Sequence, residues 1–303
     1  MGRWRESLPA VVTALLFSGS YVAGKFAVSD MGPLGITLCR YVVAAMFLST
    51  LSLSGHYRLQ RIRKRSLGRF AVLGLLGIVG YHYFFFVSLR YTDIANTAII
   101  NALSPVVTVI LAFLFLRERL GWRTMGGILL AVVGVVILIS QHESEGLSHF
   151  HLNPGDVCML ISVVCWAGYA LMVRSMAGAY SGYTITWFTT MIGVSMLLPL
   201  AAIELFHSGR ATVTMSALWP VLYMGIFASG IGYLLYNKSV HLIGATQTSG
   251  IVYGLVPIFT ALWGYLLLDE KLSLYALASM LLIIVSLGLM LGLWPRVKCN
   301  VPS

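Results

Sequence analysis

The side chain in this sequence best suited to carry a proton is His82, which lies between Tyr81 and Tyr83 inside a long apolar segment. Histidine has a reference pKa of about 6.5, so it can exchange a proton near neutral pH. All the acidic residues of the apolar segments fall near segment ends. We therefore expect His82 to contact a substrate or to carry a coupling proton. A histidine that only bonds two helices together is the open alternative.

Four aromatic residues could form a wall for a flat or cationic ligand. Trp166 and Tyr169 are about one helical turn apart near the middle of an apolar segment, away from the membrane interfaces where tryptophan is usually found. Tyr81 and Tyr253 lie in two other segments and could join them. Aromatic rings bind such ligands by stacking and by cation–π contact. Packing against lipid or a neighbouring helix is the alternative for each ring.

Two further segments carry a proline between a polar residue and a threonine, at spacings i, i+4 and i+7 that place each trio on one helix face. The trios are Asn101, Pro105, Thr108 and Tyr253, Pro257, Thr260. Proline removes a backbone hydrogen bond and bends a helix, and the freed carbonyl is tolerated only against protein or a water-filled cavity. We expect both faces to point inward, with Pro105 and Pro257 as hinges and Asn101 at a binding site. Simple packing kinks remain the alternative.

The elements that position these residues are membrane-spanning helices. Of the 303 residues, 58% are hydrophobic and only 10% are charged, and the mean hydropathy is +0.87. Such a composition excludes a water-soluble fold, and runs without period-two alternation favour helices over a barrel. Ten spans are predicted near residues 8–28, 33–53, 69–89, 94–116, 122–141, 155–176, 181–204, 216–239, 244–268 and 273–294. The first run lacks a convincing cleavage site, so it is read as a span and not as a signal peptide.

The net charge of +10 does not indicate nucleic-acid binding, because the basic residues lie between the apolar runs. If the N-terminus is cytoplasmic, most of the 20 Lys and Arg residues fall on that side. Both termini are therefore predicted to be cytoplasmic. The basic stretch 58–69 fits a topology signal, with binding of anionic lipid as the alternative. The histidines and glutamates of segment 142–151 have no fixed helical spacing, so neither a metal nor a cofactor is expected.

The chain repeats itself at an offset of 152 residues. Gly80-Tyr81 recurs as Gly232-Tyr233, Pro105 as Pro257, Thr108 as Thr260 and Glu118 as Glu270. Five spans per half is an odd number, so the halves 8–141 and 155–294 must enter the membrane from opposite sides. Inverted repeats are typical of secondary transporters, in which two similar halves give alternating access to a central site. The predicted fold is an all-α integral membrane protein, with two inverted five-helix repeats around a central cavity.

These motifs resemble those of the drug/metabolite transporter superfamily, EamA type, over nearly the whole chain. Each half has a proline-containing fourth helix that ends in Leu-x-Glu-[Arg/Lys]-Leu, at 116–120 and 268–272. Leu38-Cys39-Arg40-Tyr41 and Ser18-Gly19-Ser20 also fit the family pattern, whereas the second half keeps it only loosely as Trp166-Ala167-Gly168. The resemblance implies export of amino acids or related metabolites, the aromatic amino acid branch among them. It also implies a central cavity lined by helices 1, 3, 4, 6, 8 and 9.

Two cationic side chains in the outer parts of the first two helices could attract a substrate carboxylate. Arg40 is expected instead to extend to the outer headgroups, as long basic side chains near helix ends commonly do. Lys25 stays a candidate substrate contact, because the resemblance places the first helix at the cavity.

The predicted function is a secondary exporter of small metabolites in the inner membrane of a bacterium, acting as a monomer or weak homodimer. A broad-specificity drug or cation exporter and a passive facilitator remain alternatives. A membrane-embedded enzyme is disfavoured, since the sequence has no zinc-protease motif, no aspartyl pair and no nucleophile elbow. It also has no nucleotide-binding loop that would let ATP drive transport directly. The partners expected are therefore a small-molecule substrate, the lipid bilayer and a coupling proton.

Overall fold

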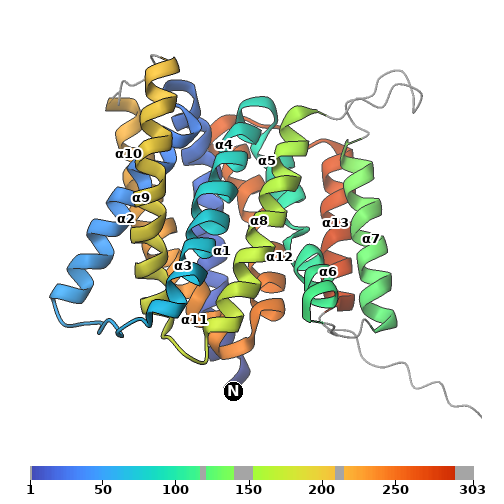
Figure 1. Cartoon of the computed structure of the whole chain (residues 1–303). Coiled ribbons are helices and arrows are strands. Elements are labelled where there is room, and N and C mark those ends of the chain that lie inside the picture. The colour runs from blue at the N-terminus through green and yellow to red at the C-terminus, as the bar shows by residue number, and fades with distance from the viewer. Residues whose placement is uncertain (1, 117–120, 140–152, 209–214, 291–303) are drawn as a thin grey trace, which may run out of the picture.

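The computed structural model describes residues 2–116, 121–139, 153–208 and 215–290, and all regular elements within them are helical (Figure 1). Eight helical segments in this part of the chain are long and apolar enough to cross a membrane, and two shorter apolar helices, Met125–Leu138 and Leu274–Leu289, accompany them. The predicted all-α membrane fold is confirmed. Glu118 and the segment 142–151 lie outside the described residues.

The first half consists of α1 (Gly2–Asp30), α2 (Pro33–Leu53), η1 (Lys64–Ser66), α3 (Leu67–Gly74), η2 (Leu75–Gly80), α4 (Tyr81–Tyr91), α5 (Ile94–Asn101), α6 (Ser104–Leu116) and α7 (Trp122–Ile139). The second consists of α8 (Pro154–Met176), α9 (Gly182–Ser208), α10 (Met215–Tyr223), η5 (Met224–Gly232), α11 (Tyr233–Ile243), α12 (Ala245–Leu268) and α13 (Leu274–Met290).

Local sequence explains where several of these helices begin. Pro33 opens α2, where a missing backbone N–H costs nothing because the first turn has no partner for it. The Asn153 side chain accepts a hydrogen bond from the Gly155 N–H at 2.8 Å and so caps α8. Gly244, with φ of 83°, supplies the backbone conformation at the junction of α11 and α12 that an L side chain rarely adopts.

One span in each half contains a π-helical turn at the same place. The segment η2 separates α3 from α4, and η5 separates α10 from α11. Each π-helical segment ends at the glycine of the repeated Gly-Tyr pair, so that Tyr81 and Tyr233 begin the helices that follow. A π-helical turn changes the rotation of the helix beyond it and is frequent at functional sites.

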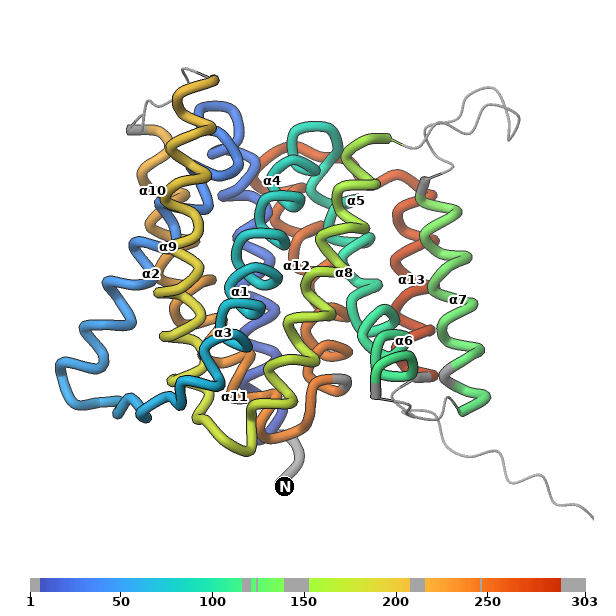
Figure 2. Tube along the Cα trace, in the orientation of Figure 1, coloured from blue at the N-terminus to red at the C-terminus, as the bar shows by residue number. Residues whose placement is uncertain are grey.

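The helix packing also has matching pairs in the two halves. The first helix of one half packs on the fourth of the other, as α1 against α12 and α8 against α5 and α6. It also packs on the third, as α1 against η5 and α11 and as α8 against η2 and α4. The chain traced in Figure 2 shows α1 and α8 starting at opposite ends of the bundle. This arrangement supports the inverted repeat, which stays a prediction.

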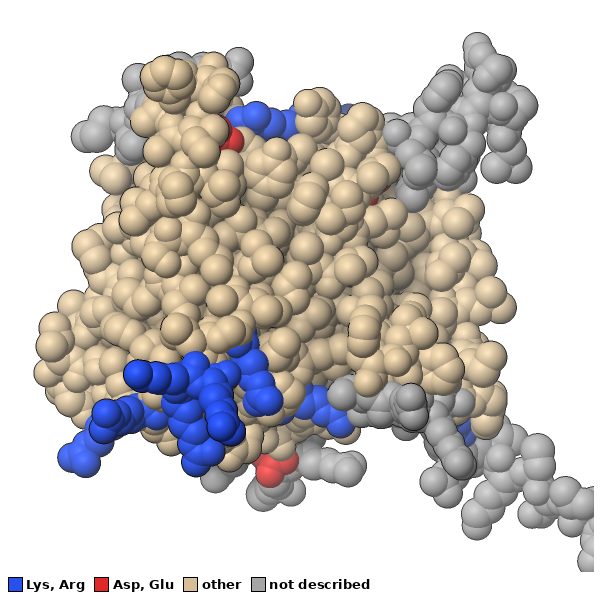
Figure 3. Space-filling model, in the orientation of Figure 1, with Lys and Arg blue, Asp and Glu red and all other residues tan. Residues whose placement is uncertain are grey.

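The surface has the distribution of charge that a bilayer requires. On the face shown in Figure 3, the middle of the molecule is free of Lys, Arg, Asp and Glu, and basic side chains gather at the end where the N-terminus lies. Between α2 and α3, the chain carries Arg58, Arg61, Arg63, Lys64 and Arg65. Large apolar side chains such as Leu114, Leu129 and Phe206 are exposed, as expected for residues in contact with lipid.

Candidate substrate site

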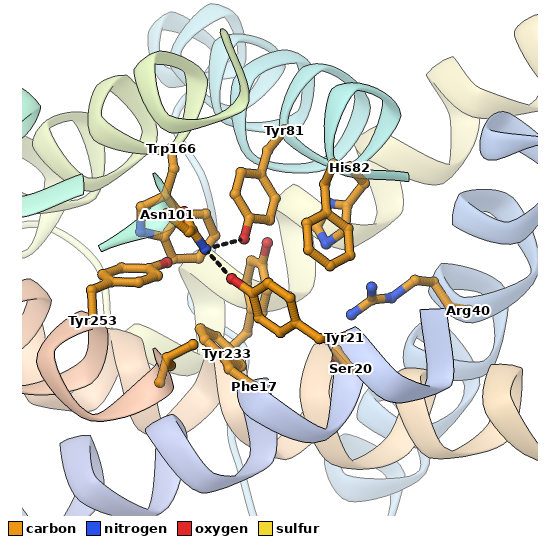
Figure 4. Close-up of a pocket in the computed structure, with 12 residues that line it drawn as sticks. Phe17, Ser20, Tyr21, Arg40, Tyr81, His82, Asn101, Trp166, Tyr233 and Tyr253 are labelled. Carbon is orange, nitrogen blue, oxygen red and sulfur yellow. Dashed lines mark hydrogen bonds between the residues drawn. The ribbon is translucent and has the colours of Figure 1, made fainter. Parts of the chain in front are cut away.

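A small pocket lies at the centre of the bundle, where helices of both halves meet (Figure 4). Its walls come from α1, α2, α4, α5, α8, α11 and α12. The family resemblance implied spans 1, 3, 4, 6, 8 and 9, and α1, α4, α5, α8, α11 and α12 belong to these spans in that order. Its lining residues are Phe17, Ser20, Tyr21, Arg40, Tyr81, His82, Phe85, Asn101, Trp166, Tyr233, Tyr253 and Val256.

Trp166 is the centre of the aromatic lining. It is fully buried, and its ring centroid lies 4.8 Å from that of Tyr81, 5.4 Å from Tyr233 and 6.0 Å from Tyr253. The ring contacts therefore join helices of both halves. In this conformation the rings pack against rings of neighbouring helices, which is one of the alternatives that the sequence left open for them. The same rings present flat apolar faces to the pocket.

Asn101 organises the polar side of the pocket from the end of α5. Its side-chain N–H₂ donates hydrogen bonds to the hydroxyls of Tyr21 at 2.5 Å and Tyr81 at 3.1 Å, and its carbonyl oxygen accepts from Ser104. By contrast, Ser20 Oγ, Trp166 Nε1 and Tyr253 Oη have no partner of ordinary hydrogen-bond geometry among the described residues. Buried polar atoms of this kind are rare, and they are suited to bond a ligand.

His82 lies in the pocket wall beside Tyr41 and is nearly fully buried. Its Nδ1 is 3.1 Å from the carbonyl oxygen of Ile78, and a carbonyl only accepts, so the hydrogen is assigned to Nδ1. Its Nε2, 3.5 Å from the hydroxyl of Tyr41, is then the nitrogen able to take up a proton. This geometry suits a proton carrier, and the bond to Ile78 is equally what a packing histidine would make.

The prediction that the side chain of Arg40 extends to the headgroups is wrong. The side chain is only 2% exposed and lines the pocket. Its Nε donates to Ser229 Oγ at 2.9 Å, within η5. An apolar helix leaves its rotation about its own axis undetermined by sequence, and the packing of α2 against η5 turns this residue inward.

Two predicted contact residues do not line the pocket. The Lys25 ammonium donates to the backbone carbonyl oxygens of Leu89 at 3.2 Å and Thr92 at 3.0 Å, so it fastens α1 to the end of α4. Tyr169 lies behind Trp166, with 5.1 Å between their ring centroids, and its hydroxyl donates to Asn237. Tyr169 thus supports the wall without facing the pocket.

The two prolines differ between the halves. In the first half the helix is interrupted at Ala102 and Leu103, and Pro105 falls in the first turn of a new helix, α6. In the second half Pro257 lies inside the continuous helix α12. Both predicted faces are buried, as expected, and the role of the two prolines as hinges stays a prediction.

Glu270, two residues beyond the end of α12, connects the two halves of the chain. Its Oε1 accepts a hydrogen bond of 3.4 Å from the backbone N–H of Ile94, at the start of α5. Partial burial raises the pKa of the Glu270 carboxyl, and the negative charge of Asp93 raises it further. The hydrogen bond from Ile94 favours the ionised carboxyl, but burial and Asp93 outweigh it.

Sequence reasoning missed Phe17, Ser20, Tyr21, Phe85, Tyr233 and Val256 as lining residues, and it placed Arg40 elsewhere. A signal was available for Tyr233, which is Tyr81 displaced by the repeat offset. Ser20 is the last residue of the Ser18-Gly19-Ser20 motif, and Tyr21 follows it, in a helix expected at the cavity. No comparable signal marked Phe85, because it belongs to a run of aromatic residues that covers every side of its helix.

Comparisons with known proteins agree with this architecture. The profile of the EamA-like transporter family matches residues 5–140 and again residues 153–292. The "Uncharacterized transporter YyaM" of Bacillus subtilis is 29% identical, over 81% of this chain and 80% of its own length. A "Probable terminal-alkyne amino-acid exporter" of Streptantibioticus cattleyicolor is 24% identical, over 82% and 80%.

A crystal structure has the same fold. It covers 98% of this chain and 100% of its own, with a TM-score of 0.71 and 18% sequence identity. That likeness shows the fold alone. With the family profile covering most of both halves, the conclusion is that this chain belongs to the EamA-like transporter family.

Proposed function

We propose that the protein is a secondary transporter that exports amino acids or related small metabolites by alternating access, with the central pocket as its substrate site. The relatives are named as transporters, and one is named as an amino-acid exporter. The pocket combines flat aromatic faces with unpartnered polar atoms, which suits a small amphipathic metabolite.

The observation that carries this proposal is the small size of the pocket between the two halves. Its cavity volume is about 20 Å³, room for a single water molecule. An amino acid needs several times that space, so the helices must separate before it binds. A site that is too small for its substrate in this conformation favours a transporter that changes conformation over an open channel.

The π-helical segments are proposed to assist that change. Tyr233, which follows η5, donates a hydrogen bond to the carbonyl oxygen of Gly77 in η2 at 3.0 Å. The residue that follows one irregular segment is therefore bonded to the other, beside the pocket. Irregular backbone can rearrange at lower cost than a regular helix, because its hydrogen bonds are already displaced. The interruption at Ala102 and Leu103 supplies a third such point.

The proposed site of action is the inner membrane of a bacterium, with the N-terminus and the basic stretch 58–69 on the cytoplasmic side. The gathering of basic side chains at one end of the molecule supports this orientation (Figure 3). His82 is proposed as the residue that couples transport to a proton, because its Nε2 carries no hydrogen in the assigned tautomer and its side chain lines the pocket.

The test is transport by the purified protein in liposomes. Radiolabelled phenylalanine, leucine and glutamate are offered with and without a pH gradient, and counterflow against unlabelled solute is measured. Saturable uptake that is accelerated by solute on the opposite side is expected for at least one amino acid. Protein-free liposomes are the control. Flux that rises linearly with concentration and shows no counterflow would refute alternating access and indicate a passive facilitator.

A further inference from the structure

The strongest unexplained feature of the pocket is a buried cation with only neutral neighbours. Arg40 points into the pocket from α2 (Figure 4). Besides the bond to Ser229, its Nη1 lies 3.7 Å from the sulfur of Met224. Its guanidinium carbon is 5.6 Å from the ring centroid of Tyr41 and 5.8 Å from that of Phe86. In the described part of the chain, no carboxylate pairs with it.

A guanidinium group has five N–H donors. Ser229 and Met224 each take one of them, so three N–H groups of Arg40 have no acceptor among the described residues. An ionised group in the membrane interior is costly unless it is paired or reaches water. The pocket is the place where a partner for the remaining donors can enter. The positive charge and the remaining N–H donors of Arg40 together favour binding of an anion in the pocket.

The surroundings narrow that anion to a carboxylate on a flat or apolar body. One arginine supplies a single positive charge, which matches the single negative charge of a carboxylate, and its planar fork bonds both carboxylate oxygens. The opposite wall presents the rings of Trp166 and Tyr81, beside the unpartnered Ser20 Oγ and Tyr253 Oη. The same positive charge repels an organic cation.

We propose that Arg40 binds the carboxylate of the transported compound, and that the substrates are small organic acids, zwitterionic amino acids included. This inference rests on the proposed function of the pocket and adds the substrate class to it. The body of the substrate packs against Trp166 and Tyr81. Since Arg40 belongs to α2 and its partners Ser229 and Met224 belong to η5, the bound carboxylate also touches the point where the two halves meet.

The experiment compares pairs of compounds that differ in the carboxylate. Proteoliposomes are assayed with radiolabelled phenylalanine and phenethylamine, and with leucine and isoamylamine. The wild-type protein is expected to transport at least one acid and neither amine. This comparison requires no mutation, so a folding defect cannot affect its result. Equal transport of an amine and its parent acid would overturn the carboxylate assignment and leave the proposed transport function intact.

Variants then test the residue itself. Arg40→Gln is expected to raise the KM for the transported acid roughly tenfold to a hundredfold, as loss of a charge-assisted hydrogen bond predicts. Arg40→Lys is expected to recover part of this loss, because it keeps the charge but not the bidentate fork. Arg69→Gln, at an exposed arginine of α3, is the matched control and should leave KM unchanged.

Circular dichroism and thermal unfolding of each variant establish that it is folded. A folded Arg40→Gln protein with an unchanged KM would overturn the role of Arg40, even if the acid-only preference holds. If the wild-type protein transports no compound of the panel, the proposed function is overturned, and the role of Arg40 in binding a carboxylate is overturned with it.

Discussion

Replacing Trp166 by alanine is the sharpest test of the central ring cluster. The side chain is fully buried and contacts the rings of Tyr81, Tyr233 and Tyr253, among others. In a bilayer or a micelle the unfolded chain also keeps tryptophan away from water, so the transfer term largely cancels. What remains is the lost packing and the cavity left behind.

The magnitude follows from the size of the ring. An aromatic side chain buries roughly 150–250 Å². A cost of about 20 cal/mol per Å² of cavity surface then gives a loss of roughly 3–5 kcal/mol in the free energy of unfolding. We expect this loss for Trp166→Ala, and loss of transport as well, because the flat wall of the site is gone.

The assay is reversible unfolding in mixed micelles with increasing denaturing detergent, followed by far-ultraviolet circular dichroism. The matched control is Trp219→Ala. Trp219 is 51% exposed on the lipid-facing surface and pairs with the ring of Phe26 at 5.8 Å. Its loss should cost about 0.5 kcal/mol or less. Equal effects of the two substitutions would refute the reasoning, since they would mean that Trp166 is not packed inside the bundle.

Three further predictions concern protons and topology. His82→Gln should abolish the dependence of transport on a pH gradient while counterflow at equal pH persists; an unchanged pH profile in liposomes would remove His82 from coupling. The raised pKa of Glu270 makes its ionised form unfavourable in the folded state, so the protein should gain stability as the pH falls from neutral towards the ordinary range of a glutamate, and Glu270→Gln should flatten that dependence. Thermal unfolding between pH 4.5 and 7.5 measures this, and an identical slope in the variant would argue against it. Cysteines placed at His56 and Lys271, in a background free of native cysteines, should react with an impermeant maleimide from the cytoplasmic and outer sides respectively; labelling from one common side would contradict the inverted repeat.

Part of the site could be predicted from sequence because its residues are chemically unusual for a membrane span. His82, Asn101 and Trp166 are polar or large side chains in the middle of apolar segments, where each requires a partner or a function. The structure brings these three to one pocket. Lys25 was equally unusual, yet its charge is satisfied by two backbone carbonyl groups away from the pocket. The residue type therefore indicated that each of these side chains has a partner, but it could not indicate whether the partner is a ligand or another part of the chain.

The sequence by itself determined the helical nature of the membrane segments and their approximate positions, whereas the number of ten spans stays a prediction beside the eight long apolar helices of the described residues. Lipid offers no hydrogen bonds, so each apolar run must close its own backbone bonds, and this requirement is local. Rotation of each helix, the π-helical turns before Tyr81 and Tyr233, and the inward position of Arg40 were decided only by tertiary structure. These features depend on contacts between segments such as α2 and η5, which lie far apart in the chain. A helix that is apolar all round carries no stripe that would reveal such contacts in advance.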